Sequence, residues 1–463
     1  MGRDETFEVL VIGGGQAGVP LVHALAKKGM RTALAERKQL GGSCVNFGCT
    51  PTKAVISSAR VAQLARRGDE FGLRITGVRP DFERVLGRAR DIVMQSRAGL
   101  RDSFRRKGAA ELLSGHARFV GRDSKVFLLR VGRRTVRAKQ VVINTGTRSR
   151  IPPIPGLSEI PYIDAENWLD RSELPSHLIV LGGGYTGLEL GQFYRRMGSR
   201  VTVVDQNKEI VNQEDPEVGM ALRQFLESEE IAFRLSARVT RVRRAGAGIR
   251  MRIDQEGASA TLEATHLFVG TGRQPNTDNL GLETVRLKTS REGFVEVNRH
   301  LATGVQGIWA AGDVRGGPMF THTSWDDYRV LLSQLAGDRK RTTDRVLPYA
   351  IYTDPQLGRV GMTEVEARKA GRKVRVARFE MQKNGKAREM GEPGGFVKIL
   401  AEPRSGRVLG VAIVAAEAAE MVHVFVTLMN AKSSYRAVAD ATFIHPTLAE
   451  ATQSAVAALD EES

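Results

Sequence analysis

The sequence predicts an α/β protein built from two similar parallel-sheet units and a separate α+β domain at its C-terminal end. Two observations predict the paired units: a strand, a glycine-rich turn and an apolar helix follow one another near residue 13, and the same order returns near residue 182. A third observation is a change of texture after Pro348, where short strands alternate with helices and no glycine-rich turn of this kind occurs. At 463 residues the chain is long enough for about three domains.

The first glycine-rich turn follows a buried strand, and it matches the pattern Gly-x-Gly-x-x-Gly at Gly13, Gly15 and Gly18. In this pattern the first glycine makes the turn, the second lets the backbone approach a pyrophosphate, and the third lets the helix pack on the strand. A second strand, residues 31–35, ends at Glu36, where a carboxylate can accept hydrogen bonds from ribose hydroxyls. The pattern therefore predicts a Rossmann-like unit that binds a dinucleotide.

The second turn follows the strand 178–181 and matches the same pattern at Gly182, Gly184 and Gly187. The next strand ends at Asp205, at the same offset from the first glycine as Glu36. One such turn alone is weak evidence, but two of them, each between strand and helix and each followed by an acid, predict two dinucleotide sites. A carboxylate accepts from a free 2′-hydroxyl and repels a 2′-phosphate, so Asp205 favours NAD(H), with NADP(H) as the alternative.

The remaining elements are predicted from composition and from breaks at glycine and proline. Residues 81–107 are helical in composition and lead into short strands at 117–131 and 140–143, before a proline-rich linker at 151–156. Strands that end in glycine recur at 267–273 and 307–313. After Pro348 we expect strands at 358–362, 374–379, 395–400 and 408–414, and then a helix at 446–459.

The chain has two cysteines, Cys44 and Cys49, which lie directly after the first unit's second strand and before a helical sequence. So few cysteines exclude a disulfide-stapled scaffold and a cysteine-rich metal site, and no metal site is expected. At a helix N-terminus the dipole stabilises a thiolate, and Lys53, one turn past Cys49, adds a positive charge. The pattern indicates a local redox pair, and the alternative is two unrelated buried thiols.

Together these motifs resemble the class I pyridine nucleotide–disulfide oxidoreductases, which include dihydrolipoamide dehydrogenase, glutathione reductase and mercuric reductase. The resemblance covers essentially the whole chain, in order. It implies an FAD-dependent enzyme that passes electrons from NAD(P)H through FAD to a Cys44–Cys49 disulfide and on to an acceptor. It also implies an FAD domain at 1–150 and 273–345, an NAD(P) domain at 151–272, and an interface domain at 346–463.

The resemblance assigns roles to residues at matching positions. Cys44 would be the interchange thiol that attacks the acceptor, and Cys49 would be the thiolate beside the flavin. Lys53, paired with Glu189, would lie near flavin N5. FAD would further contact Gly42, Ser43, Ala117, Thr145, Gly146, Arg273, Asp313, Met319, Phe320 and Thr321.

Three further roles are implied by the same resemblance. Tyr185 would cover the nicotinamide pocket and move when the cofactor enters, and Gly272 would also contact the nicotinamide nucleotide. His445, followed by Pro446 and held by Glu450, would be a general base supplied by a partner subunit. The resemblance therefore implies a homodimer.

The acceptor is narrowed by two departures from the family's patterns. Residues 316–323 resemble mercuric-reductase-like and reactive-chlorine-resistance flavoproteins, but the C-terminal cysteine pair typical of mercuric reductases is missing. Phe443 stands where lipoamide dehydrogenases usually carry the first histidine of His-x-His-Pro. We therefore expect a mercuric-reductase-like enzyme with a small disulfide, a metal ion or an oxidant as acceptor. The alternative is dihydrolipoamide dehydrogenase.

The chain is basic, with 69 Lys and Arg against 52 Asp and Glu, a formal charge of +17. Residues 60–139, here called the basic stretch, hold 21 Lys and Arg against 8 Asp and Glu. A different class of function is a catalytically silent flavoprotein with a basic nucleic-acid-binding face. Aromatic residues do not alternate with these arginines as a stacking platform needs, so nucleic acid is not expected as a partner. With no run of eighteen apolar residues and no leader pattern, no membrane partner is expected and a cytoplasmic location is predicted.

Overall fold

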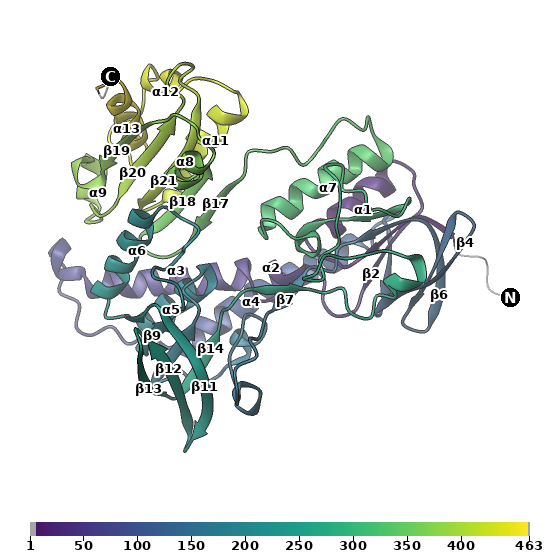
Figure 1. Ribbon diagram of the computed structural model, residues 1–463, viewed down its shortest axis with the longest axis horizontal. Coiled ribbons are helices and arrows are strands. Elements are labelled where there is room, and N and C mark those ends of the chain that lie inside the picture. Colours follow the sequence, from purple (N-terminus) through teal and green to yellow (C-terminus); the bar gives the residue numbers. More distant parts are fainter. Residues whose placement is uncertain (1–5, 462–463) are drawn as a thin grey trace.

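The computed structural model describes residues 6–461. They form two α/β units and a C-terminal α+β domain, which confirms the predicted fold class. Figure 1 shows the first unit at the right, the second unit at the lower left and the C-terminal domain at the upper left. Two long helices, α3 (Cys49–Arg66) and α4 (Phe82–Ser103), lie side by side between them.

The first unit is built on a sheet with strand order β3-β2-β1-β6-β5-β4, in which β16 also pairs with β6. Its parallel strands are β1 (Thr6–Ile12), β2 (Thr32–Glu36), β3 (Glu111–Ser114), β6 (Arg134–Ile143) and β16 (Ile308–Ala310). An antiparallel meander extends it through β4 (Ala117–Asp123) and β5 (Val126–Val131). The helices of this unit are α1 (Gly18–Lys27), α2 (Gly42–Asn46) and α7 (Thr321–Ala336).

The second unit repeats this plan with the parallel order β10-β9-β8-β14. The strands are β8 (His177–Leu181), β9 (Arg200–Val204), β10 (Ala232–Arg234) and β14 (His266–Val269). It also carries a meander, which the sequence analysis did not predict, formed by β11 (Ala237–Ala245), β12 (Gly248–Gln255) and β13 (Ala258–Ala264). Its helices are α5 (Tyr185–Met197) and α6 (Pro216–Ser228).

The C-terminal domain is an antiparallel sheet of order β17-β18-β21-β20-β19. The strands are β17 (Pro348–Ile351), β18 (Gln356–Gly361), β19 (Arg375–Glu380), β20 (Phe396–Ala401) and β21 (Val408–Ala415). The helices are α8 (Glu364–Lys369), α9 (Gly385–Glu389), α10 (Ala418–Met421), α11 (His423–Asn430), α12 (Arg436–Ala439) and α13 (Glu450–Glu461).

The last helix begins later than expected, so the prediction of a helix from residue 446 was wrong at its start. Glu450 is the first residue of α13, and its carboxylate accepts a hydrogen bond from the backbone N–H of Thr447 at 2.7 Å. This contact holds the residues before the helix in a turn, in which the His445–Pro446 peptide bond is cis.

The second unit is inserted between two short strands that pair with each other. β7 (Thr147–Ser149) and β15 (Arg273–Pro275) lie antiparallel where the chain enters and leaves this unit. Short 3-10 helices complete the structure: η1 (Gly68–Phe71), η2 (Leu157–Glu159), η3 (Trp168–Asp170), η4 (Leu282–Val285), η5 (Gly312–Arg315) and η6 (Met381–Lys383).

One hydrophobic core joins α3, α4, the second unit and the C-terminal domain. Its buried members include Val55 on α3, Leu86 on α4, Phe193 on α5 and Phe396 on β20. Because buried side chains from all four parts pack together, the second unit and the C-terminal domain are held against the same two long helices. Among residues 6–461, no helix combines the length and the apolar character that crossing a membrane requires.

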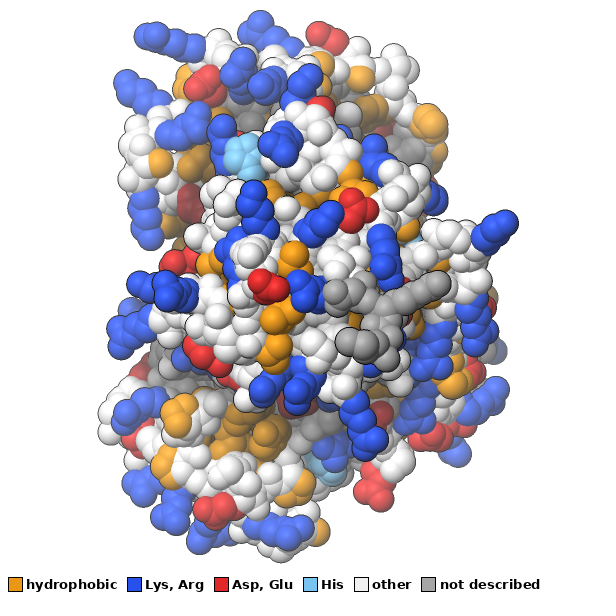
Figure 2. Space-filling view, turned by 90° about the vertical axis from the view of Figure 1, so that its right-hand side faces the viewer, with side chains coloured by type: hydrophobic (Ala, Val, Ile, Leu, Met, Phe, Trp, Pro, Cys, Tyr) orange, Lys and Arg blue, Asp and Glu red, His pale blue; other side chains and the backbone are white. Residues whose placement is uncertain are grey.

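The basic stretch falls on α3, α4 and the meander of the first unit. Figure 2 shows Lys and Arg side chains spread over the face of the molecule that lies at the right of Figure 1. Several arginines of this stretch bind acids: Arg60 pairs with Glu392 and Glu417 of the C-terminal domain, and Arg90 pairs with Glu83. Part of the excess charge therefore stabilises contacts between elements.

Candidate redox site and nucleotide sites

The two predicted glycine turns have the same geometry. The first glycine of each turn has a positive φ, 109° at Gly13 and 107° at Gly182, a region that L side chains rarely adopt. A Cβ atom on Gly18 would lie 2.3 Å from the carbonyl oxygen of Gly13, and one on Gly187 would lie 2.3 Å from that of Gly182. Only glycine lets each helix pack this closely on its turn.

The two predicted acids also lie in equivalent places, at the ends of β2 and β9. Glu36 accepts a hydrogen bond from the backbone N–H of Gly14 at 2.8 Å, and Asp205 accepts one from that of Gly183 at 2.6 Å. The second oxygen of Asp205 accepts from the backbone N–H and the side chain of Asn207, both at 2.8 Å. Each carboxylate is thereby fixed beside its glycine turn.

The residues around both turns fit a bound dinucleotide. A Cβ on Gly184 would meet nothing within 4 Å, and the same holds at Gly146 and Gly272, so the backbone there can be approached closely. The hydroxyl of Thr145 is buried without a hydrogen-bond partner, as expected where a polar ligand group supplies one. Ala117 is packed in the core of the first unit and is only 3% exposed, so it offers little surface to a ligand.

Gly42 and Ser43, the two residues before Cys44, lie in α2 against the first turn. A Cβ on Gly42 would lie 2.9 Å from Cα of Gly15, so a glycine is needed where these two backbones meet. Asn144 supports the same turn, because its side chain donates to the carbonyl oxygen of Gly13 at 3.0 Å. The redox pair is therefore carried on backbone that touches the first nucleotide turn.

The two cysteines lie at the junction of α2 and α3 and are free thiols. Hydrogen bonding to Cys44 is the main cause that lowers the pKa of Cys49 to about 6, with further help from Lys53 and from Thr321. The same hydrogen bond, together with burial, raises the pKa of Cys44. The Thr321 hydroxyl lies 3.2 Å from Sγ of Cys49. These contacts favour a thiolate on Cys49 and a proton on Cys44.

Lys53 links three parts of the fold beside this thiolate. Its Nζ lies 2.7 Å from Glu189 on α5 and 4.6 Å from the ring centroid of Tyr352, which follows β17. The other oxygen of Glu189 accepts from the backbone N–H of Tyr352 at 2.8 Å. Burial opposes the charge of Lys53, but Glu189 and Cys49 outweigh it, so its pKa is raised. The predicted Lys53–Glu189 pair is present, and Tyr352 is an unpredicted third member.

A cluster of aromatic rings lies next to Thr321. Phe320 and Tyr349 are nearly parallel with centroids 5.2 Å apart, and Tyr185 stacks on both, at 6.1 and 5.8 Å. His322 stacks on Phe320 at 5.3 Å. The structure therefore brings the predicted Tyr185 and Phe320 together and adds two rings that the sequence analysis did not name. Met319, the residue before Phe320, is half-buried.

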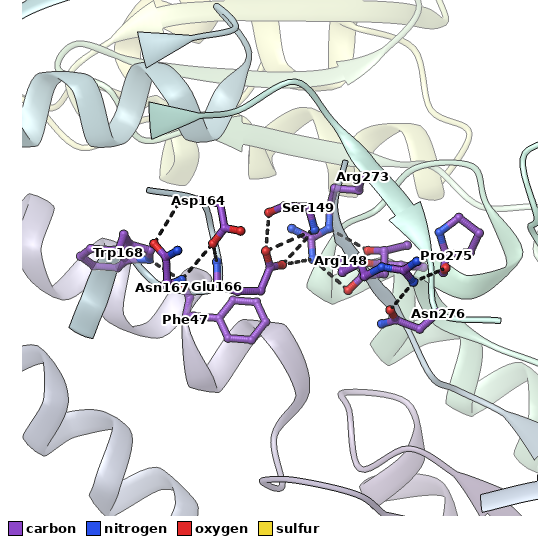
Figure 3. Close-up of polar contacts among 12 residues, drawn as sticks. Phe47, Arg148, Ser149, Asp164, Glu166, Asn167, Trp168, Arg273, Pro275 and Asn276 are labelled. Atoms are coloured by element: carbon purple, nitrogen blue, oxygen red, sulfur yellow. Dashed lines mark hydrogen bonds and ion pairs between the residues drawn. The ribbon is translucent and has the colours of Figure 1, made fainter. Parts of the chain in front are cut away.

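Arg273 and Asp313 meet through Thr147, where the second unit joins the first. Arg273 donates to the Thr147 hydroxyl at 2.7 Å, and that hydroxyl donates to Asp313 at 3.2 Å. Arg273 also binds Glu166, which accepts from Ser149, as Figure 3 shows. Burial raises the pKa of Asp313. Arg273 and Asp313, both predicted to contact FAD, are thus held in one hydrogen-bond network where the second unit joins the first.

Trp168 contacts the segment between Cys44 and Cys49, and the sequence analysis did not predict this contact. Its indole N–H donates to the carbonyl oxygen of Phe47, which lies between the two cysteines, at 2.8 Å. Asp164 braces this segment by accepting from the backbone N–H groups of Glu166 and Asn167, as Figure 3 shows. A buried tryptophan needs an acceptor for its N–H, and that need is the signal that could have pointed to this contact.

His445 and Glu450 form the predicted pair near the C-terminal end. Nδ1 of His445 lies 2.9 Å from Glu450, and the His445 side chain is 77% exposed. A backbone hydrogen bond from Thr447 is the main cause, ahead of His445, that lowers the pKa of Glu450. The imidazole is therefore oriented by a carboxylate and turned outward from its own chain, beside the exposed side chain of Ile444.

The chain resembles known proteins over nearly its whole length. Residues 7–327 match the family model described as pyridine nucleotide-disulphide oxidoreductase, and residues 347–456 match its dimerisation domain. The chain is 35% identical to a dihydrolipoyl dehydrogenase of Cupriavidus necator, over 98% of both chains. It is 31% identical to the probable pyridine nucleotide-disulfide oxidoreductase RclA of Escherichia coli, over 96% of this chain and 97% of RclA.

A solved structure has the same fold. The Cu(II) complex of the HOCl-induced flavoprotein disulfide reductase RclA from Escherichia coli superimposes with a TM-score of 0.88 at 30% identity. The match covers 98% of this chain and 99% of RclA. The chain belongs to the pyridine nucleotide-disulfide oxidoreductase family. It is an FAD-dependent oxidoreductase that uses a pyridine nucleotide, so the predicted family, enzyme class and cofactor types are confirmed.

Proposed function

We propose that this enzyme oxidises NADH and delivers the electrons through Cys44 and Cys49 to a metal ion, an oxidant or a small disulfide. FAD, held at the first glycine turn by Gly13, Gly15 and Gly18, would supply the chemistry that links the nicotinamide to the disulfide. Two electrons and one proton convert that disulfide into a thiolate and a thiol. The chain's own residues would have to deliver and remove this proton.

The observation that carries the proposal is the placement of Cys49 at the start of α3, 3.2 Å from the Thr321 hydroxyl and within a turn of the Lys53–Glu189 pair. The contact with Cys44, together with these surroundings, lowers the pKa of Cys49, whereas the same contact and burial raise that of Cys44.

Cys44 must lose its proton before it can attack an acceptor, because the thiolate is the nucleophile. A base is therefore needed on the acceptor side of the pair. We assign this role to His445 of the partner subunit, since Glu450 fixes its tautomer and its ring faces outward. The match of the C-terminal domain to a dimerisation domain supports a homodimer as the working unit.

The preference for NADH over NADPH rests on Asp205. Its carboxylate is fixed beside the second glycine turn, where a 2′-phosphate would be repelled and a 2′-hydroxyl bound. We expect kcat/KM for NADH to exceed that for NADPH by about tenfold or more. A preference for NADPH would contradict the proposal. In the variant Asp205→Ser the ratio of kcat/KM for NADH to that for NADPH should fall, because the carboxylate no longer repels the 2′-phosphate.

The proposed domains are an FAD domain at 1–150 and 273–345, an NAD(P) domain at 151–272, and an interface domain at 346–463. The pairing of β7 with β15 at the entry and exit of the second unit supports the two inner boundaries. Limited proteolysis of the FAD-loaded enzyme checks them, because cleavage should concentrate near these junctions rather than inside the units.

A metal-ion or oxidant acceptor is favoured over lipoamide by two observations. Phe443 stands where the lipoamide enzymes carry histidine, and the solved relative RclA is described as HOCl-induced and as a Cu(II) complex. The identity to dihydrolipoyl dehydrogenase keeps the lipoamide reaction as the second candidate. Mercuric-reductase-like chemistry is part of the first candidate, since Hg(II) and Cu(II) are both thiophilic ions.

A panel of acceptors separates these candidates. Steady-state rates with NADH are compared for Cu(II), Hg(II), oxidised glutathione and lipoamide. We expect turnover with at least one metal ion and a loss of about 100-fold or more in Cys44→Ser and in Cys49→Ser. Both variants should keep their flavin, which serves as the control for folding. High turnover with lipoamide alone would instead establish the second candidate.

A further inference from the structure

Three consecutive residues before α6 connect the second unit to its surroundings. Gln213 accepts from the hydroxyl of Tyr185 at 3.3 Å, and Glu214 accepts from the hydroxyl of Tyr349 on β17. Asp215 accepts from Lys398 on β20 at 3.0 Å. One short segment therefore touches Tyr185 at one end and the sheet of the C-terminal domain at the other.

Glu214 cannot easily leave its place between Tyr349 and Arg359. The side chains of Glu214 and Arg359 are both fully buried, and Nε of Arg359 lies 3.6 Å from Glu214. The three guanidinium nitrogens of Arg359 have no hydrogen-bond partner, so Glu214 is the acid that compensates this buried charge. Moving Glu214 away would leave a buried cation uncompensated, which is strongly unfavourable. The carboxylate that holds Tyr349 is thus itself held in place.

Packing alone does not fix the ring of Tyr349. The ring stacks on Phe320 and Tyr185, but its residue also lines a cavity of about 420 Å³ between α7, β17 and α11. Where open space lies beside a side chain, a directional contact at its far end restricts its position further. Here that contact is the hydrogen bond from the Tyr349 hydroxyl to Glu214.

We propose that Tyr349 is a positioning residue that holds Tyr185 in the ring stack and thereby sets the affinity for the nicotinamide half of the cofactor. The inference rests on the proposed function and on the role that the family resemblance implies for Tyr185, which would cover the nicotinamide pocket. When the nicotinamide enters, Tyr185 must leave Tyr349 and Phe320. The apparent dissociation constant therefore rises as the closed arrangement becomes more populated. The sheet of the C-terminal domain, through Arg359 and Glu214, stabilises that arrangement.

The variant Tyr349→Phe tests this, because it keeps the stacking ring and removes the hydroxyl that Glu214 binds. Dissociation constants of NAD⁺ and of ADP-ribose are measured by calorimetry on the oxidised, FAD-loaded enzyme, without turnover. We expect NAD⁺ to bind about threefold to fivefold more tightly and ADP-ribose to bind unchanged. ADP-ribose lacks the nicotinamide, so it does not need Tyr185 to move. An equal change for both ligands, no change, or weaker NAD⁺ binding would overturn the inference.

Two controls separate positioning from a general loss of structure. Tyr435→Phe removes another tyrosine–carboxylate hydrogen bond of the C-terminal domain, to Asp460 at 2.6 Å, and should leave both dissociation constants unchanged. In the background of Tyr185→Ala, adding Tyr349→Phe should no longer affect NAD⁺ binding; a persisting effect refutes the inference. A wild-type enzyme that binds neither ligand would overturn the proposed function and the inference together, a result distinct from all the others.

Discussion

The two nucleotide units of this enzyme share a strand, a glycine turn, a helix and a second strand that leads to an acid, here called the frame. They differ in the loop that comes after this second strand. In both units a Cβ on the third glycine would lie 2.3 Å from the carbonyl oxygen of the first, and the acid after the second strand accepts from the turn. The segment after Glu36 in the first unit, called the first loop here although it includes α2 and the start of α3, carries Cys44 and Cys49. The loop after Asp205 in the second unit, which ends at Asp215, binds the C-terminal domain.

This difference teaches where function is placed on a repeated fold. The frame demands glycine and an acid at fixed positions because backbone atoms meet there, so both copies keep them. The loop after the second strand has no such demand and can be used for unrelated tasks, a redox pair in one copy and a contact to another domain in the other. Substitutions in the frame and in each loop test whether the two copies are separable.

The largest effect is expected when the close-packed glycine of either turn is replaced. In Gly18→Ala the new Cβ would meet a carbonyl oxygen of the first turn at 2.3 Å, and we expect the enzyme to be purified without FAD. In Gly187→Ala the same contact occurs in the second turn, and we expect FAD to be retained while NADH affinity falls by at least about 100-fold. Flavin absorbance and NADH titration measure the two losses.

The matched control is Gly99→Ala on α4, where a Cβ would meet nothing within 4 Å and the helix favours alanine. This variant should keep both FAD and NADH binding. If Gly187→Ala also lost FAD, or Gly18→Ala kept it, the two units would not be separable copies of one frame.

The next effect concerns the contact that only the second loop makes. Lys398 has a side chain 3% exposed and binds Asp215 at 3.0 Å, Glu364 at 2.7 Å and also Glu217. Lys398→Met removes the buried cation from Asp215 and Glu217, while Glu364 keeps Arg368. We expect the free energy of unfolding to fall by about 3 kcal/mol. Chemical denaturation measures this loss. Lys386→Met, which breaks an exposed pair with Glu389, should cost less than about 0.5 kcal/mol; equal losses would show that the buried cluster has no special weight.

A smaller effect is expected at the first loop, where Lys53 supports the thiolate. The pKa of Cys49 is lowered to about 6, so its thiolate is lost as the pH falls through that value. Lys53→Met should raise this pKa and reduce the thiolate population near pH 6 by about threefold to tenfold. The ultraviolet absorbance of the thiolate, followed against pH in the reduced enzyme, measures the change. Lys53→Arg keeps the charge and should keep the inflection; a shift as large in Lys53→Arg would exclude the charge as the cause.

The frame of both units could be predicted from the sequence because its positions are local. Gly13 and Glu36 belong to one strand–turn–helix–strand segment, and Gly182 and Asp205 belong to a second one. In each segment the spacing alone indicates the contact between the glycine turn and the acid.

The redox pair was likewise indicated locally, by two cysteines five residues apart before a helical sequence. The Lys53–Glu189 pair was expected only through a resemblance, since these residues lie 136 apart in the sequence.

The contacts between domains could not be predicted in this way. Tyr349, Tyr352 and Trp168 carry no motif, and their partners come from segments brought together only by tertiary packing. The second meander was also missed, because its strands are rich in arginine on the exposed face and lack the apolar runs that mark buried strands. The start of α13 was misplaced because a side-chain contact of Glu450 decides it.

The smallest effect is expected at Gln213, which contacts Tyr185 from the same loop that holds Tyr349. Its hydrogen bond to the Tyr185 hydroxyl is long, 3.3 Å, and partly exposed to water, so it contributes little to holding the ring. Gln213→Ala should therefore strengthen NAD⁺ binding by no more than about twofold, less than Tyr349→Phe. The measurement is the same calorimetric titration.

Whether Gln213→Ala or Tyr349→Phe has the larger effect on NAD⁺ binding distinguishes two ways in which Tyr185 could be held. If the ring stack positions it, removing the Tyr349 hydroxyl matters more, because the stack is fixed through Glu214 and Arg359 in the buried seam. If instead Gln213→Ala gave the larger effect, Tyr185 would be held by its own hydroxyl. The second loop would then act on the cofactor without the C-terminal domain.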